Sequence, residues 1–208
     1  ILERYGMSEA GMIASNPLEG DRLPGTVGFP LPKIEVRVSD RNGKSLPHGE
    51  TGVLEVKGPN LFPGYWGKPE MNVTEFRTDG FFISGDLATM NDDGRITIVG
   101  RDRDLVITGG FNVYPKEVED CLNELPGVKE SAVIGVPHPD FGEALVALIA
   151  GDKNTVPGEQ TVITALKRNL AAFKVPRRII RLDALPKNAM GKVQKNTLRE
   201  TYADVIKD

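Results

Sequence analysis

Residues 100–104 read Gly-Arg-Asp-Arg-Asp, and this charged stretch divides the chain into two halves of different character. Charged side chains are rarely buried without partners, so four in a row between two apolar segments suit a connector better than a core. A solvated hairpin turn would show the same pattern equally well. We predict a domain boundary here, with residues 1–102 in one unit and residues 103–208 in the next.

The half before this connector is predicted to consist mostly of β-strands. Residues 34–38, Ile-Glu-Val-Arg-Val, alternate apolar and charged side chains, which is the period-two pattern of a half-buried strand. More short strands are expected at residues 53–57, 81–83 and 95–99, with Asn-Gly and Asp-Gly turns in this half. Strands at this spacing predict a small distorted barrel or a sandwich. Residues 1–4 are predicted to belong to a strand that begins before residue 1, so we expect the chain to be a piece of a longer protein.

The half after the connector is predicted to be a small, mobile α+β domain. Pro115 can open a helix because its missing N–H would be unpaired at that position, and apolar residues then recur at helical spacing. Further elements are expected downstream: a helix at residues 160–173, a strand at 178–182, and a final helix at 198–206 that starts at a capping box of Thr197 and Glu200. The fold class predicted for the whole chain is therefore α+β.

Composition places the chain among ordinary globular proteins. Hydrophobic residues make up 39% and charged residues 26%, which supplies enough apolar material for a core. The net charge of −3 gives no general attraction to nucleic acid or to a membrane surface. No apolar run approaches the roughly 20 residues that would span a bilayer. The single cysteine, Cys121, excludes an internal disulfide, and a cytoplasmic location is expected.

Three segments of the first half carry residues suited to binding a nucleotide. Within residues 5–9, Tyr-Gly-Met-Ser-Glu, a hydroxyl and a carboxylate in one loop can hold a phosphate oxygen and Mg²⁺, but a helix start or a surface turn would look the same. Asp86, at the expected end of a strand after Ser84 and Gly85, can accept hydrogen bonds from a ribose cis-diol or serve as a turn residue. Arg101 can bind the same ribose or a phosphate, or form a surface ion pair.

The second half contributes a glycine pair and a lysine. Gly109 and Gly110 permit positive φ angles and a close approach of a ligand to the backbone, although a β-bulge or a bend would need them equally. Lys192 lies in a turn-prone stretch and suits a mobile cation that meets negative charge developing on a phosphoryl group. Residues 174–199 hold eight Lys or Arg against one acid, so this stretch is predicted either to attract phosphates or to form a solvated face.

Other catalytic classes have no matching motif in the sequence. His48 and His138 have no cysteine or carboxylate at the spacing of a zinc site, and Cys121 falls on the apolar face of a predicted helix. Neither a Walker A lysine loop nor a G-x-G-x-x-G fingerprint is present.

Taken in order, these segments resemble the adenylate-forming superfamily of acyl-CoA synthetases, firefly luciferases and peptide-synthetase adenylation domains, over essentially the whole chain. Residues 5–9 are similar to its Y-G-x-T-E motif, with serine where threonine is usual, and Lys192 matches its adenylation lysine. Within the superfamily, residues 79–83, 106–115 and 190–196 are most similar to malonyl-CoA synthetases.

For the nucleotide, the resemblance implies a role for five residues of the first half. Tyr5 and Ser8 would contact the adenine and the phosphates, and Glu9 would bind the Mg²⁺ that accompanies ATP. Asp86 and Arg101 would hold the ribose hydroxyls.

For the second half, the resemblance implies a catalytic lysine, a CoA channel and a hinge. Lys192 would drive adenylation, Gly109 and Gly110 would border the tunnel for the pantetheine arm of CoA, and Arg103 would occupy the hinge position, where aspartate or lysine is more usual. The small domain would rotate about this hinge between adenylation and thioester formation.

The implied function is an ATP-dependent acid–CoA ligase of fatty acid metabolism, which converts malonate, ATP and CoA to malonyl-CoA, AMP and pyrophosphate through an acyl-adenylate. A lysine acetyltransferase and deacetylase acting on Lys192 are implied as further partners. Another short-chain or aryl acyl-CoA ligase, and a nonenzymatic nucleotide- or anion-binding module, stay open as alternatives. The Ser/Thr/Gly-rich phosphate loop of the superfamily is not in these residues, so this segment alone is not expected to form acyl-adenylate efficiently.

Overall fold

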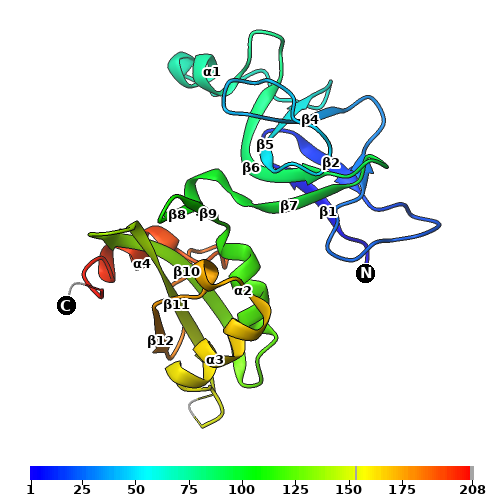
Figure 1. Ribbon diagram of the computed structural model, residues 1–208. Helices are drawn as coiled ribbons and strands as arrows, with labels where there is room; N and C mark the ends of the chain where they lie inside the picture. The colour runs from blue at the N-terminus through cyan, green and yellow to red at the C-terminus, as the bar shows by residue number, and fades with distance from the viewer. Residues whose placement is uncertain (153, 207–208) are drawn as a thin grey trace. The chain divides into compact units, whose positions relative to one another are not determined.

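The computed structural model describes residues 1–152 and 154–206, which form two compact units that divide between Arg103 and Asp104 (Figure 1). Each unit contains both strands and helices, so the predicted α+β class is confirmed. The assignment of residues 1–102 and 103–208 to functional domains, and the hinge at Arg103, stay predictions. No helix in the described part of the chain has the length and apolar character needed to span a bilayer.

Two antiparallel sheets build the first unit. The smaller sheet has the order β1-β2-β3 and the larger has the order β4-β5-β6-β7. Their strands are β1 (Arg4–Met7), β2 (Gly11–Ser15), β3 (Phe29–Pro30), β4 (Glu35–Ser39), β5 (Gly52–Lys57), β6 (Phe82–Met90) and β7 (Ile96–Arg101), and one helix, α1 (Pro69–Glu75), precedes β6. Within the described residues the strands form two sheets and not the closed barrel that a distorted-barrel prediction suggests.

A shared core holds the two sheets of the first unit together. Ile13 and Ala14 of β2 pack in one buried cluster with Leu54 and Val56 of β5 and Ile96 of β7. A single bridge between Gly28 and Ile96 links the sheets through the backbone. The sheets are thus joined by side-chain burial and one bridge, with no continuous strand ladder between them.

The second unit is a sheet covered on both faces. The strands β8 (Val106–Thr108), β9 (Phe111–Val113), β10 (Val128–His138), β11 (Gly142–Gly151) and β12 (Arg178–Leu182) run antiparallel except that β12 is parallel to β11. The helices are α2 (Pro115–Asn123), α3 (Glu159–Asn169) and α4 (Lys195–Thr201), with a short 3₁₀ turn η2 (Ala172–Lys174). Another 3₁₀ turn, η1 (Asp102–Asp104), contains the point at which the two units divide.

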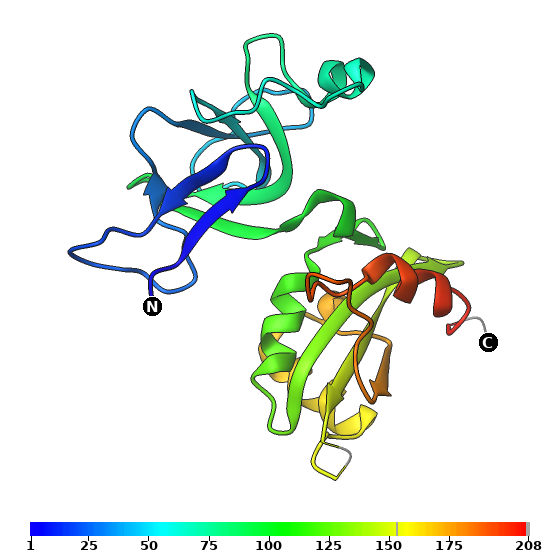
Figure 2. The same ribbon diagram turned by 180° about the vertical axis from the view of Figure 1, so that it is seen from behind.

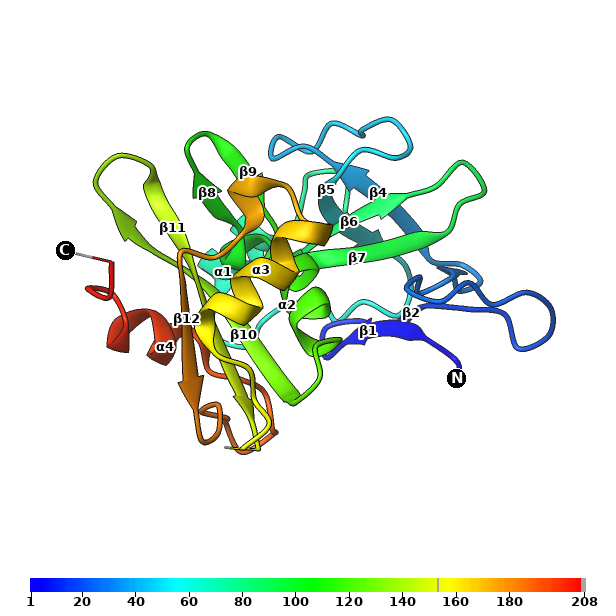
Figure 3. The ribbon, with the colours of Figure 1, turned by 60° about the horizontal axis from the view of Figure 1, so that its bottom comes forward.

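Alternate residues of β10 and β11 face opposite layers. Val133 packs with α2 and α3 residues in one cluster, whereas Ile134 packs with Leu198 of α4 in another. Figures 2 and 3 show α4 on the side of the β10–β11 pair away from α2 and α3. Because both faces of these strands are buried, their sequences are continuously apolar and do not alternate between apolar and polar residues.

Four predicted strands of the first half appear as β4 to β7, and the strand predicted at 178–182 is β12. The strands β2 and β3 and the helix α1 were not predicted, because they have two to seven residues and little periodicity. The strand expected at residues 1–4 begins only at Arg4.

Two helix predictions were wrong in their bounds. The helix predicted to end at residue 173 ends at Asn169, because the backbone of Leu170 is extended before η2 begins. The last helix begins at Lys195, three residues earlier than predicted, so Thr197 lies inside its first turn and no capping box forms. The backbone N–H of Gln194 donates to the carbonyl of Pro186, which fixes the chain just before that start.

Candidate functional site

A bulge in β6 carries Asp86. Opposite the single residue Leu54 of β5, β6 places three residues, Ser84 to Asp86, between the paired positions Ile83 and Leu87. Gly85 has a φ of +71°, which glycine adopts without strain. The Ser84 hydroxyl donates to the carbonyl of Leu54 at 2.7 Å and accepts from the N–H of Asp86 at 3.1 Å. Asp86 therefore lies inside a long strand and not at a strand end as predicted, and the bulge is what redirects its side chain.

Three predicted nucleotide-binding residues meet at this bulge. The Tyr5 hydroxyl of β1 donates to Oδ2 of Asp86 at 2.5 Å, and Nε of Arg101 in β7 lies 2.9 Å from Oδ1. Asp86 is only 4% exposed, whereas the side chain of Arg101 is 43% exposed. Carboxylate oxygens accept from hydroxyl groups, and the partly exposed guanidinium of Arg101 can contact the same ligand.

Burial is the main cause that raises the pKa of the Tyr5 phenol far above its ordinary value, and the neighbouring carboxylate of Asp86 raises it further. Tyr5 is therefore a neutral hydrogen-bond donor near neutral pH. Its hydroxyl faces Asp86, which adds a contact to the adenine role that the sequence resemblance implies for this residue.

Ser8 and Glu9 lie in the turn that joins β1 to β2. Ser8 is exposed and Glu9 is half-buried. The Tyr65 hydroxyl donates to Oε1 of Glu9 at 3.1 Å, and burial followed by this hydrogen bond raises the pKa of Tyr65 to about 12. Sequence reasoning gave Tyr65 no role, because 56 residues separate the two side chains.

The donor set of this turn fits a Mg²⁺ ion that arrives with a nucleotide. No cluster of three or more His, Cys, Asp or Glu side chains occurs within residues 1–152 and 154–206, so a metal here would have Glu9 as its carboxylate. Mg²⁺ characteristically takes one or two carboxylates and completes its shell with phosphate oxygens and water. Within the described residues, Oε2 of Glu9 accepts no hydrogen bond, which leaves it available to a cation.

In the second unit, Gly109 and Gly110 form the two-residue turn between β8 and β9. Their φ angles are +55° and +82°, as a type I′ hairpin turn requires. The N–H of Gly109 donates to the carbonyl of Phe141 at 3.0 Å, and a Cβ at Gly109 would lie 3.1 Å from the Phe141 ring. The glycine pair therefore makes a tight hairpin that approaches Phe141 closely.

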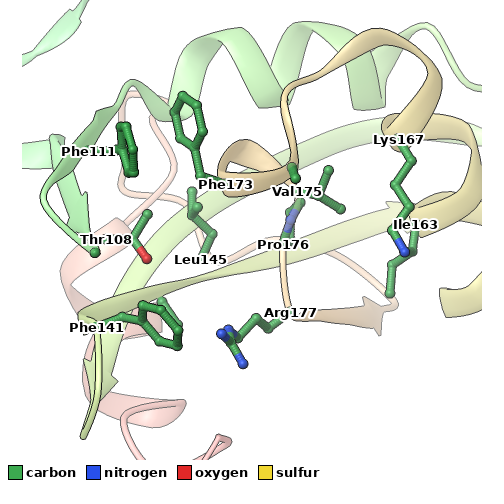
Figure 4. Close-up of a pocket in the computed structure, with 13 residues that line it drawn as sticks. Thr108, Phe111, Phe141, Leu145, Ile163, Lys167, Phe173, Val175, Pro176 and Arg177 are labelled. Carbon is green, nitrogen blue, oxygen red and sulfur yellow. The ribbon is translucent and has the colours of Figure 1, made fainter.

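A pocket of about 460 Å³ opens beside this hairpin (Figure 4). The rings of Phe111 and Phe173 stack with centroids 4.5 Å apart, and the guanidinium carbon of Arg177 lies 4.6 Å from the centroid of Phe141. Lys167 adds a second cation to the lining. An aromatic pocket with cations suits a flat ring that carries phosphate groups. Sequence reasoning identified Gly109 here, and Arg177 only as one cation of the basic stretch, because the lining residues come from separate segments.

Lys192 closes a compact exposed turn. Oδ1 of Asn188 accepts from the N–H groups of Met190 and Lys192, both at 3.0 Å, and the N–H of Asn188 donates to the carbonyl of Lys192 at 2.9 Å. Gly191 has a φ of +77° at the apex. Within the described residues the Lys192 side chain forms no ion pair, so its ammonium is free to meet a ligand.

Most of the other cations in the basic stretch are neutralised by acids from elsewhere in the second unit. Five ion pairs do this: Lys174–Glu117, Arg178–Glu159, Lys187–Glu130, Lys195–Glu119 and Arg199–Asp104. These pairs were not apparent from the sequence, because only one acid lies inside the stretch, and the attraction of phosphates by this stretch stays a prediction.

Arg103 lies in η1 between two anchored acids. Asp102 pairs with Arg41 of the first unit at 3.2 Å, and Asp104 pairs with Arg199 of the second unit at 2.5 Å. Arg103 itself is exposed and has no ion pair within the described residues. This arrangement is compatible with the predicted hinge.

Comparison with known proteins gives two family matches. A model described as AMP-binding enzyme matches residues 1–66, and one described as AMP-binding enzyme C-terminal domain matches residues 117–192. Among curated relatives, a malonate–CoA ligase of Arabidopsis thaliana is 39% identical over 212 residues, covering 97% of this chain and 34% of the relative. A long-chain-fatty-acid–CoA ligase of Escherichia coli O6:H1 is 37% identical over 201 residues, covering 96% and 36%.

Solved structures agree with these matches. ATP-bound MatB from Rhodopseudomonas palustris is 56% identical with a TM-score of 0.94, covering 99% of this chain and 41% of that one. The o-succinylbenzoate CoA synthetase MenE from Bacillus subtilis, in complex with its acyl-adenylate intermediate, is 31% identical with a TM-score of 0.85, covering 95% and 40%. The chain thus spans between 34% and 41% of the length of these proteins.

The Tyr5–Asp86 hydrogen bond predicts a loss of stability in alkali. The folded-state pKa of Tyr5 is raised, so the stability it contributes is complete below pH 10, the ordinary pKa of the phenol, and is lost as pH rises above that value. Urea unfolding from pH 8 to pH 11 should therefore show a steeper fall for the wild type than for Tyr5→Phe. Equal pH slopes for the two proteins would contradict this assignment.

Proposed function

This chain belongs to the adenylate-forming family of AMP-binding enzymes, and we propose on that basis that the complete protein is an ATP-dependent acid–CoA ligase. The observation that carries the proposal is the convergence of Tyr5 and Arg101 on the buried carboxylate of Asp86. A fixed acid beside a cation suits the hydroxyls of a ribose and the adjacent phosphate. Relatives named as CoA ligases support the same reaction class.

The proposed reaction has two steps. In the first, an oxygen of the acid's carboxylate attacks the α-phosphorus of ATP, the bond to the bridging oxygen of pyrophosphate breaks, and pyrophosphate leaves. In the second, the thiolate of CoA attacks the acyl carbon, the bond to the AMP oxygen breaks, and AMP leaves. Both steps create or move negative charge, so positioned cations and hydrogen-bond donors lower their barriers.

Each site residue has a part in this scheme. Asp86 and Arg101 orient the ribose, Ser8 donates to a phosphate oxygen, and Glu9 holds the Mg²⁺ whose chemistry is to neutralise charge on the phosphates. Lys192 supplies its unpaired ammonium to the phosphoryl group in the first step only. The turn around Lys192 is held by Asn188 while the ammonium itself is exposed, which favours a preformed but movable cation.

CoA is proposed to use the hairpin and pocket of the second unit. Gly109 and Gly110 allow the pantetheine arm to pass close to the backbone of the hairpin. The rings of Phe173 and Phe141 offer faces on which the adenine of CoA can stack, and Arg177 lies within reach of its phosphates. Arg103 is proposed as the hinge at which the small domain turns between the two steps.

Malonate is the proposed acid. The Arabidopsis malonate–CoA ligase and MatB support this choice, while relatives named for long-chain fatty acids and for feruloyl-CoA make another acyl or aryl acid the alternative. A nonenzymatic nucleotide- or anion-binding module is the alternative from another class.

A panel of carboxylic acids tests the substrate. With the complete protein, ATP and CoA, AMP release should be at least about 100-fold more efficient in kcat/KM for malonate than for propionate, because the methyl group of propionate leaves the groups that bind the second carboxylate without a partner. Propionate is the matched control since it has the same number of carbons. A fatty or aromatic acid used better than malonate would replace this assignment.

Lys192→Ala tests the catalytic lysine and separates an enzyme from a binding module. Removing the ammonium should lower acyl-adenylate formation by about 100-fold or more, measured as pyrophosphate exchange, because the transition state loses a charge partner. Conversion of preformed acyl-adenylate to the CoA thioester should be retained. Lys129→Ala, an exposed lysine of the same unit, is the control and should change neither step.

Acetylation of Lys192 is proposed to act in the same way as that substitution. The side chain is exposed and its charge is required, so neutralisation by an acetyltransferase would stop the first step and a deacetylase would restore it. Unchanged adenylation by protein acetylated at Lys192 would refute this part of the proposal.

Arg177→Gln tests the CoA pocket. Losing a charge-assisted hydrogen bond to phosphate should raise the KM for CoA about tenfold, without changing pyrophosphate exchange. The advantage of CoA over dephospho-CoA should shrink in the same variant. Arg168→Gln on α3 is the matched control, since Arg168 is exposed and does not line this pocket. An unchanged KM for Arg177→Gln would place CoA elsewhere.

A further inference from the structure

We infer that Tyr65 is a positioning residue that fixes the carboxylate of Glu9 for metal binding. The inference rests on the proposed function, in which Glu9 is the protein's ligand to Mg²⁺. It assigns a role to a side chain that lies far from Glu9 in sequence and that touches neither substrate in the scheme above.

Three hydrogen bonds tie the Ser8–Ala10 turn to the segment at residues 60–65. The N–H of Phe62 donates to the carbonyl of Glu9 at 2.8 Å, and Nδ2 of Asn60 donates to the carbonyl of Ala10 at 2.6 Å. The Tyr65 hydroxyl donates to Oε1 of Glu9 at 3.1 Å. Two of these bonds fix the backbone of the turn, and only the third acts on the Glu9 carboxylate.

The Tyr65 ring is itself held in place. It packs edge-on against Phe62 with centroids 4.8 Å apart and planes at 76°, and Phe62 in turn packs on Phe82 at 5.5 Å. The N–H of Tyr65 donates to Oδ1 of Asn72 at 2.7 Å. A ring fixed by packing and by its backbone delivers its hydroxyl to one position, which is the property of a useful orienting group.

The hydroxyl leaves the carboxylate of Glu9 with one occupied and one available oxygen. A flexible glutamate would have to be ordered when the metal binds, and that ordering costs affinity. Tyr65 orders the side chain beforehand and points the free oxygen away from its own hydroxyl. Partners of this kind, which hydrogen-bond a metal ligand, typically change metal affinity by about 10- to 100-fold when removed.

Metal binding by the complete protein tests the inference without relying on turnover. Mn²⁺, which takes the same oxygen ligands, can be titrated in the presence of a nonhydrolysable ATP analogue and followed by electron paramagnetic resonance. Tyr65→Phe should weaken Mn²⁺ binding about tenfold, while the melting temperature stays unchanged because the ring contacts remain. Tyr202→Phe, the same change at a half-buried tyrosine of the second unit, should leave Mn²⁺ binding unaltered.

Two further variants separate this inference from the proposed function. Glu9→Gln should weaken Mn²⁺ binding more than Tyr65→Phe, and Tyr65→Phe should add nothing in the Glu9→Gln background. If Glu9→Gln leaves Mn²⁺ binding intact, the metal role of Glu9 in the proposed function fails. If Glu9→Gln weakens binding but Tyr65→Phe binds Mn²⁺ as the wild type does, the positioning role alone is overturned.

Discussion

The buried carboxylate of Asp86 is the constraint on which the candidate nucleotide site depends. Removing a carboxylate from water is costly unless donors and an opposite charge replace the solvent. Here Tyr5 comes from the smaller sheet and Arg101 from the neighbouring strand of the larger sheet. The requirement to satisfy one acid therefore brings β1 and β7 to the same point, and the bulge at Gly85 makes room for it.

In the second unit, the cations of the basic stretch mostly form ion pairs with acids of the same unit. Most cations of its C-terminal stretch are locked in ion pairs that join helices, strands and η1, such as Lys195 with Glu119 and Arg199 with Asp104. The side chains of these two pairs are between 15% and 26% exposed, so water screens them only in part, and the pairing removes their charge from competition for a ligand. Because its ammonium stays unpaired within the described residues, Lys192 retains the free charge that phosphoryl transfer requires, and Arg177 keeps its guanidinium at the aromatic pocket.

The sequence allowed the class of fold and most of the longer elements to be predicted, because strands β4 to β7 and helices α2 and α3 carry clear periodicity. It did not allow prediction of the short strands β2 and β3. Ile13 and Ala14 of β2 pack in a core shared with the larger sheet, and no local sequence pattern indicates that packing. Similarly, the residues predicted to bind the nucleotide in the first half occur in short motifs, whereas the contact between Tyr65 and Glu9 could not be predicted because it exists only in three dimensions. The ion pairs of the basic stretch could not be predicted for the same reason, because the neutralising acids lie at distant positions such as Glu117 and Glu159.

Asp86 and Glu9 differ in one respect that matches their proposed ligands. Each carboxylate accepts from a tyrosine hydroxyl, Tyr5 in one case and Tyr65 in the other. Asp86 is also paired with Arg101, so the charge of the pair is balanced and uncharged hydroxyls are suitable partners. Glu9 has no ion pair within residues 1–152 and 154–206, so its negative charge is uncompensated and favours a cation. In the proposed scheme, the same type of hydrogen bond serves an acid that binds a sugar and an acid that binds a metal, and the neighbouring guanidinium of Arg101 distinguishes the two.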